Sequence, residues 1–443
     1  MTNQPGSSAA ILVSSPRRTA FALALLYALT LIATQSVQAQ TYTVLHTFSG
    51  GADGGNPLDG LSMDRAGNLY GTTGTGGNTQ GSCAEYSGCG VVFQMKHFGS
   101  SWVLTPLYSF TGSPDGRYPY GRVIFGPDGA LYGTTQYGGH QGSYGEDCGV
   151  VYRVAPPATA PRSAIFPWTE TILYSPLGEG GDGCVLIDAG GLSFDASGNL
   201  FGTSYFGGSG VCCGTVFEVT RSDNQWTPSV LYSFTGGSDG ENPSAGVTLD
   251  QAGDVFGTTN DRGCSGNCQG TVFQLVPSQS GWIENTLYAF VYNQSAGNEP
   301  EGGVILDGSG NLYGSTVSGG IYLGGTLFQL APSGGTWTFN LLYSFQGGLA
   351  LGPFSDLLLD SAGNLYGTTY SDGRFGFGSA FKLSPSGDSW IYTSLYDFHG
   401  LSDGGNPQSN LIMDAAGNLY GTASTGGSRD CESGCGVVFE ITP

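Results

Sequence analysis

Asp64-Arg65-Ala66-Gly67-Asn68-Leu69-Tyr70-Gly71-Thr72-Thr73 is the best-defined copy of a pattern that occurs seven times in this chain of 443 residues. Neighbouring copies are 53 to 69 residues apart, and together they cover nearly all of the chain beyond residue 40. A repeat of this length indicates an array of supersecondary units. The residues that correspond to Gly67 in the other copies are Gly129, Gly198, Gly253, Gly310, Gly363 and Gly417.

Each copy contains four short runs of apolar, β-branched and aromatic residues between Gly, Pro, Asn and Asp, which is typical of strands and turns. In the first copy we expect strands at 61–64, 68–73, 91–94 and 107–110, the last one following a Trp. Four strands in about 55 residues predict a propeller blade. We interpret Asp64 as a turn residue that accepts backbone N–H bonds, in preference to a calcium ligand. We expect Gly71 to allow the close approach of a neighbouring sheet.

The two ends of the repeat array complement each other. There are seven fourth strands but only six preceding Trp residues, and the strand without one, at 45–48, is the first in the chain. The last copy ends after its third strand, at Ile441. Pairing of residues 43–48 with 437–441 would close a ring and remove two exposed sheet edges, whereas an open solenoid would not need such complementarity. The predicted fold is therefore all-β, a single seven-bladed β-propeller closed by the N-terminal strand.

The N-terminal segment is different in character. Residues 1–39 contain no acidic residue, and Arg17 and Arg18 precede an apolar run at 20–33. Val37-Gln38-Ala39 supplies a cleavage site of small or apolar residues. We predict a signal peptide over residues 1–39, a propeller domain over 40–443, and a secreted or periplasmic protein; the alternative is an N-terminal membrane anchor. The export route stays open.

The amino-acid composition limits the kinds of molecule that this protein can bind. The chain has 13 Lys and Arg residues against 34 Asp and Glu, a formal charge of −21. Nucleic-acid binding requires clusters of basic residues, so we exclude it. Charged residues make up only 11% and Gly numbers 78, which excludes a coiled coil or helical bundle. We expect a monomer with no membrane span in the mature chain.

The ten cysteines are interpreted as disulfides because an exported compartment favours them. A zinc site is the alternative, but no His lies at ligand spacing from a Cys pair. The pairing of Cys212 and Cys213 stays open. The expected disulfides are Cys83 with Cys89, Cys264 with Cys268 and Cys431 with Cys435, and Cys148 with Cys184 is a further candidate pair.

The links after strands two and four vary most among the copies and should lie at one end of the ring, where loops on a rigid scaffold carry function. Their Asp, Asn and Gly residues could simply make turns. Alternatively, their oxygens could bind sugar hydroxyls or Ca²⁺, if neighbouring blades share the ion; we expect no other cofactor. The candidate binding residues are Asp53, Asn56, Asp115, Asp182, Asp239, Asn242, Asn298, Asp403 and Asn406.

The ordered recurrence of Pro, Asp-x-x-Gly-Asn-Leu-Tyr-Gly-Thr-Thr, Gly-Val-Val-Phe, Trp and Leu-Tyr-Ser-Phe resembles the GloVer (Gloeo_Verruco) tandem repeat of choice-of-anchor proteins. The resemblance spans residues 42–443. The copy that contains Ala130 in place of the Asn at position 68 departs most from it. The family implies an exported bacterial repeat protein and supplies no catalytic residues.

Three function classes follow. The leading hypothesis is an exported binding module, for polysaccharide, envelope components or a protein. The second is a polysaccharide lyase or glycosidase that uses rim carboxylates, although no catalytic residue can be named and we favour a non-enzyme. The third is a purely structural repeat protein. His140 and Glu146, which share one rim loop, are the only His–acid pair to test there.

Overall fold

The computed structural model describes residues 1, 40–99, 101–140, 147–157, 168–178, 181–186, 191–208, 213–222, 225–261, 268–292, 295–346 and 352–442. Residues Tyr42–Thr442 form one compact unit. The predicted signal peptide lies outside the described residues, except for Met1. Within the described part of the chain, no helix is both long enough and apolar enough to cross a membrane.

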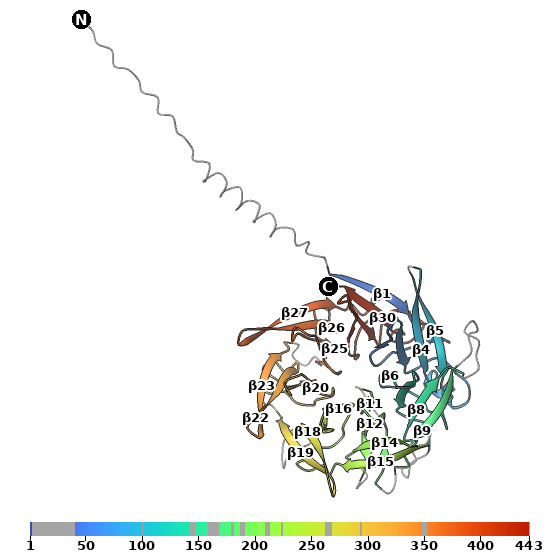
Figure 1. Cartoon of the computed structure of the whole chain (residues 1–443). Helices are drawn as coiled ribbons and strands as arrows, with labels where there is room; N and C mark the ends of the chain where they lie inside the picture. The colour runs from blue at the N-terminus through green and yellow to red at the C-terminus, as the bar shows by residue number, and fades with distance from the viewer. Residues whose placement is uncertain are drawn as a thin grey trace. The chain divides into compact units, whose positions relative to one another are not determined.

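Seven antiparallel four-stranded sheets are arranged around a central axis as the blades of a propeller (Figure 1). In six blades the strands follow the chain outward from the axis. Blade 1 contains β2 (Ser62–Met63), β3 (Leu69–Thr73), β4 (Val91–Phe98) and β5 (Ser101–Ser109); blade 2 contains β6 (Ile124–Phe125), β7 (Leu131–Thr135), β8 (Val150–Ala155) and β9 (Thr169–Tyr174); blade 3 contains β11 (Ser193–Phe194), β12 (Leu200–Ser204), β14 (Thr215–Ser222) and β15 (Gln225–Ser233).

Blade 4 contains β16 (Thr248–Leu249), β17 (Val255–Thr259), β18 (Cys268–Ser278) and β19 (Gly281–Val291); blade 5 contains β20 (Ile305–Leu306), β21 (Leu312–Thr316), β22 (Thr326–Ser333) and β23 (Thr336–Ser344); blade 6 contains β24 (Leu358–Leu359), β25 (Leu365–Thr369), β26 (Ser379–Ser386) and β27 (Ser389–Asp397). The described links add one short 3-10 helix, η1 (Gly81–Tyr86), and the paired strands β10 (Gly183–Cys184) and β13 (Phe206–Gly207).

Blade 7 confirms the predicted closure of the ring. It combines β28 (Ile412–Met413), β29 (Leu419–Ala423) and β30 (Val437–Thr442) with the N-terminal strand β1 (Thr41–Thr47), which pairs with β30 as the outermost strand. The first and last strands of the propeller thus lie side by side (Figure 1). This pairing covers edges that the two chain ends would otherwise leave open.

The strand positions agree with the sequence prediction, but the lengths of the first, third and fourth strands differ from it. Innermost strands such as β2 are only two residues long. Fourth strands such as β5 begin before the Trp instead of after it. Trp102 lies inside β5, opposite His97 of β4. Strands three and four form a long hairpin on the outside of the blade. Because they pair with each other, both strands are longer than the apolar runs from which they were predicted.

The first hairpin of the blade has the predicted turn chemistry. One carboxylate oxygen of Asp64 accepts the N–H groups of Ala66 and Asn68, each at 2.9 Å. The other accepts the Asn68 side-chain amide at 2.7 Å and the Tyr70 hydroxyl at 3.1 Å. Asp307, Asp360 and Asp414 make the same four contacts. These carboxylates are turn residues.

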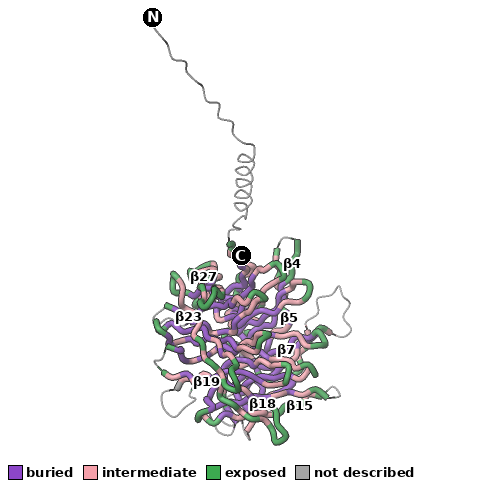
Figure 2. Tube along the Cα trace, turned by 60° about the vertical axis from the view of Figure 1, so that its left-hand side comes forward, coloured by how far each residue is buried: buried purple, intermediate pink, exposed green. Residues whose placement is uncertain are grey.

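The core lies mainly between blades, where buried Tyr, Phe, Leu and Val side chains meet. Figure 2 shows the buried segments in the interior of the propeller. Gly71 has a different role from the predicted one. It lies opposite Phe93 in the same blade, and a Cβ there would come within 2.7 Å of the Phe93 ring and 2.9 Å of Leu61. The glycine therefore makes room for a ring of its own blade, because the Phe93 ring folds across the strand pair, and not for a neighbouring sheet.

Candidate functional site

The predicted rim aspartates hold the turns that follow the fourth strands. Asp53, Asp115, Asp182, Asp239 and Asp403 accept backbone N–H bonds of 2.8–3.1 Å from Ser49, Thr111, Leu177, Thr235 and His399. Three also accept a tyrosine hydroxyl at 2.7–3.0 Å, from Tyr108, Tyr232 and Tyr396. Most of the acceptor capacity of these carboxylates is used inside the loop.

The rim asparagines join neighbouring blades. Asn56, Asn242 and Asn406 adopt left-handed φ angles of 51–59°. Their side-chain amides donate to the carbonyl oxygens of Ser424, Tyr205 and Tyr370 of the preceding blade, at 2.9–3.0 Å. Asn298 instead exchanges backbone bonds with Ser318, and Glu299 takes the left-handed position. A ligand-binding role for the rim Asp and Asn residues stays a prediction.

Three expected disulfides are present: Cys83–Cys89, Cys148–Cys184 and Cys431–Cys435. Cys213 is also disulfide-bonded. Cys264 and Cys212 lie outside the described residues, as does Glu146, and the side chain of Cys268 is not described. His140 lies 2.8 Å from the Ser175 hydroxyl. Among the residues that the structure describes, no three His, Cys, Asp or Glu side chains gather as a metal site, and the calcium site stays a prediction.

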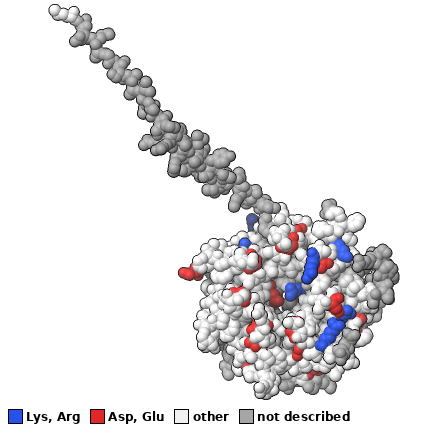
Figure 3. Space-filling model, in the orientation of Figure 1, with Lys and Arg blue, Asp and Glu red and all other residues white. Residues whose placement is uncertain are grey.

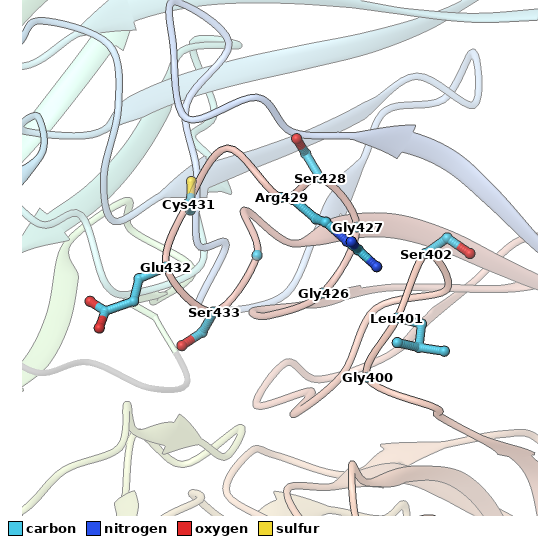
Figure 4. Close-up of a pocket in the computed structure, with 11 residues that line it drawn as sticks. Gly400, Leu401, Ser402, Gly426, Gly427, Ser428, Arg429, Cys431, Glu432 and Ser433 are labelled. Atoms are coloured by element: carbon cyan, nitrogen blue, oxygen red, sulfur yellow. The ribbon is translucent and has the colours of Figure 1, made fainter.

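A pocket of about 640 Å³ lies between two rim loops of the last blades (Figure 4). Arg429 extends toward Leu401 and Ser402, whereas Glu432 points the other way. The N–H groups of Gly426 and Gly427 are already bonded to the carbonyls of Ser433 and Leu401. The pocket therefore offers one cation and few fixed donors.

A second polar group lies on the axis of the ring, on the same end as the variable links. Tyr120 of blade 2 donates a 3.1 Å hydrogen bond to the side-chain oxygen of Gln408, which leads into blade 7. Blade 1 separates these two blades, so their side chains can meet only across the axis. The charge of Glu301, which leads into blade 5, acts on Tyr120 as well and helps burial to raise the pKa of its hydroxyl.

Glu301 supplies a carboxyl group near Tyr120. Its side chain is hydrogen-bonded to Asn260, and its backbone oxygen accepts a 3.2 Å bond from the Ser244 hydroxyl. Burial raises the pKa of Glu301 above the usual value, against the effect of its hydrogen bonds. The carboxyl also raises the pKa of Tyr205, after burial. Glu301 thus acts on tyrosines from two other blades.

A charged group from three blades lies next to these residues. Asp59 is only 2% exposed and accepts the N–H groups of Gly60 and Arg122, both at 2.6 Å. Asp356 accepts the N–H of Gly303 at 2.7 Å. Burial raises the pKa of Asp59 to about 7 and that of Asp356 above its usual value, although Arg122 lowers both. Arg122 and Asp356 stand at a repeat position that is occupied by glycine in other copies, at Gly60, Gly246 and Gly303.

We call Asp59, Tyr120, Arg122, Glu301, Asp356 and Gln408 the axial cluster. All except Asp59 are partly exposed, so solvent reaches them. None of these residues was predicted from the sequence, because the candidates were polar residues that recur in the loops. The available signal was the opposite one: a Pro recurs in six of the seven fourth-strand links, and the three positions after it vary among the copies. On the face seen in Figure 3, Lys and Arg are few and Asp and Glu are spread widely.

Comparison with known proteins identifies the repeat and the fold. The profile of the Gloeobacter/Verrucomicrobia repeat matches residues 27–183, 180–358 and 267–443. A solved ulvan lyase, described as a new family of polysaccharide lyase, is 12% identical with a TM-score of 0.52, covering 89% of this chain and 95% of that one. A putative 6-phosphogluconolactonase from Bacteroides uniformis is 14% identical with a TM-score of 0.49, covering 82% and 89%. A comparison with curated proteins finds no match.

Proposed function

This chain belongs to the Gloeobacter/Verrucomicrobia repeat family, and we propose that it is an exported propeller that binds neutral polysaccharide at its axial cluster. The observation that carries the proposal is the hydrogen bond between Tyr120 and Gln408, which come from two separate blades and are partly exposed, with the charge of Glu301 from a third blade acting on Tyr120. Phenol, carboxyl and amide groups together provide the donors, acceptors and ring surface that fix sugar hydroxyls and sugar faces.

The charges of the axial cluster favour an uncharged ligand. The cluster contains three carboxyl groups and one guanidinium, which acts on Asp59 and Asp356, and the whole chain carries a formal charge of −21. A polyanion would be repelled over distances of about a Debye length, and its own charged groups would find only Arg122 as a partner. Export is supported by the disulfides of the rim, because such bonds persist in oxidising compartments.

Thermal unfolding with a glycan panel tests the proposal. The full chain, expressed with its own leader, is melted with neutral β-1,4-glucan, xylan and mannan oligosaccharides and with acidic alginate oligosaccharides. At 100 times its dissociation constant, a neutral ligand should add about 2.7 kcal/mol of stability. Glu301→Gln should weaken binding about tenfold or more. Glu432→Gln, in the pocket of the last blades, serves as the control. A shift with alginate alone, or with no glycan, would overturn the proposal.

Cleavage of the bound chain is the second candidate. The observation that favours it is the carboxyl of Glu301 among the axial residues, because burial raises its pKa and so favours the protonated form that a general acid needs. The ulvan lyase shares only the fold with this chain, so it contributes no residue to the argument. Incubation with the polysaccharide that binds, followed by assay for new reducing or unsaturated ends, distinguishes an enzyme from a binding module.

A further inference from the structure

The repeat is broken a second time on the rim between blades 1 and 2. At the position where other links carry Gly55-Asn56, Glu241-Asn242 and Gly405-Asn406, this link carries Arg117-Tyr118. Two more tyrosines lie beside it, Tyr86 from the loop stapled by Cys83–Cys89 and Tyr137 from the link after β7. We call Tyr86, Arg117, Tyr118 and Tyr137 the rim patch.

Tyr118 occupies a position that suits asparagine better. Its φ is +56°, in the left-handed region that a bulky side chain rarely adopts. The asparagines at this position also bond a carbonyl of the preceding blade, as Asn406 does to Tyr370 at 3.0 Å. Tyr118 has no amide to make that bond, and its hydroxyl instead donates a long 3.5 Å bond to the Tyr86 carbonyl of blade 1. A residue that is both strained and a poorer connector points to a role other than stability.

Arg117 fixes the surrounding rings. Its guanidinium carbon lies 4.1 Å from the centre of the Tyr86 ring and 4.8 Å from that of Tyr137. It also forms an ion pair with Asp147 at 3.3 Å, and its side chain is only 13% exposed. Arg117 is therefore a positioning residue whose charge is already balanced. The Tyr118 ring stands nearly perpendicular to those of Tyr86 and Tyr137, with centroids 6.2 Å from each.

The rim patch adjoins the axial cluster along the chain. Arg117 and Tyr137 exchange backbone hydrogen bonds of 2.8 and 3.2 Å, and the N–H of Gln136 donates to the Tyr118 carbonyl at 2.9 Å. Tyr118 is separated from Tyr120 of the axial cluster by Pro119 alone. The same short segment thus supplies a ring to each group.

We propose that the rim patch is a second sugar subsite, which extends the axial cluster outward over blades 1 and 2 and selects a chain of several neutral sugar units over a short one. The proposal rests on the function proposed above. Tyrosine rings provide apolar faces for stacking together with a polar hydroxyl. The patch carries no net charge, since Arg117 and Asp147 balance, so it suits an uncharged chain.

Binding as a function of chain length tests the rim patch. Calorimetry with the full chain uses the disaccharides and hexasaccharides of β-1,4-glucan, xylan and mannan. In at least one series the hexasaccharide should bind about tenfold more tightly than the disaccharide. Tyr118→Asn should remove that advantage and leave disaccharide affinity unchanged. Because asparagine restores the inter-blade bond and relieves the strain, the melting temperature should rise by about 1 °C.

Two comparisons separate the possible failures. Tyr322→Asn changes another exposed rim tyrosine, on blade 5, and should leave the length dependence intact. If disaccharide and hexasaccharide bind equally, or Tyr118→Asn leaves their ratio unchanged, the rim patch is not a subsite while the axial site stands. If neither length binds in any series, or Glu301→Gln has no effect on either, the proposed function itself is wrong.

Discussion

The hairpin-turn aspartates and the axial carboxyls are the same chemical groups in opposite situations. In the turns, partial burial works to raise the pKa of Asp64, Asp307 and Asp360, but hydrogen bonds outweigh it and the pKa is lowered. At the axis, burial dominates and raises the pKa of Asp59, Glu301 and Asp356. The turn carboxylates stabilise the fold when ionised, whereas the axial carboxyls are held charged only at a cost to stability.

The difference coincides with the repeat. Turn aspartates recur at one position in six of the seven copies, and in four of these the Asn and Tyr partners recur with them. Axial residues occupy positions where the side chain varies among the copies. Polar residues that follow the repeat of this propeller therefore serve architecture, and polar residues that break it are the candidates for function.

Arg122→Met should have the largest effect on stability. It leaves Asp59 and Asp356 without their common cation, and breaking such a buried group typically costs about 3–5 kcal/mol. Because the folded-state pKa of Asp59 is raised to about 7, wild-type stability should fall as pH rises from about 4 to 7, and this fall should be steeper in the variant.

Urea unfolding at pH 5 and pH 8 measures this effect. The loss caused by Arg122→Met should be clearly larger at pH 8, above the pKa of Asp59, than at pH 5. An equal loss at the two pH values would mean that Arg122 contributes packing and not charge. Arg65→Met, at an exposed position of a hairpin turn, is the matched control.

Tyr120→Ala should produce the largest change in binding. Loss of the ring and of the hydroxyl that bonds Gln408 should weaken the neutral glycan by about 30-fold, or about 2 kcal/mol. Tyr322→Ala should not change the affinity. An equal effect of the two substitutions would mean that Tyr120 contributes no more to binding than the exposed rim residue Tyr322.

Asp360→Ala should destabilise the protein by about 1–3 kcal/mol at pH 7 without affecting glycan affinity, since it removes four hydrogen bonds of one turn. Because the folded-state pKa of Asp360 is lowered, its contribution should be lost as pH falls below about 4. Urea unfolding and calorimetry on the same samples measure both properties. A loss of affinity would place this turn in the binding machinery.

Calcium and chelator should have the smallest effect. The rim carboxylates of Asp115, Asp239 and Asp403 already accept several internal hydrogen bonds, so we expect a change in melting temperature of less than about 1 °C. A rise of several degrees with calcium alone would instead make the rim loops a metal site.

Local chemistry repeated seven times determines the blades, the hairpin turns and the ring closure, and the amino-acid sequence alone is enough to predict them. Asp64 and its equivalents select their partners within four to six residues, and strand alternation repeats within each copy, so these features are encoded in short segments. The three described disulfides could also be proposed from the sequence, because close spacing or a common rim position brings their cysteines together.

The axial cluster could be identified only from the tertiary structure. Tyr120 and Gln408 are 288 residues apart, and only the curvature of seven packed blades brings them within 3.1 Å. Burial, which raises the pKa of Asp59 and of Glu301, is likewise a property of the closed ring and of no single repeat. For the same reason, the prediction that Gly71 lies in a strand is confirmed, but the neighbour predicted for it is wrong. The Phe93 ring, and not a neighbouring sheet, lies against Gly71, because β3 pairs with β4.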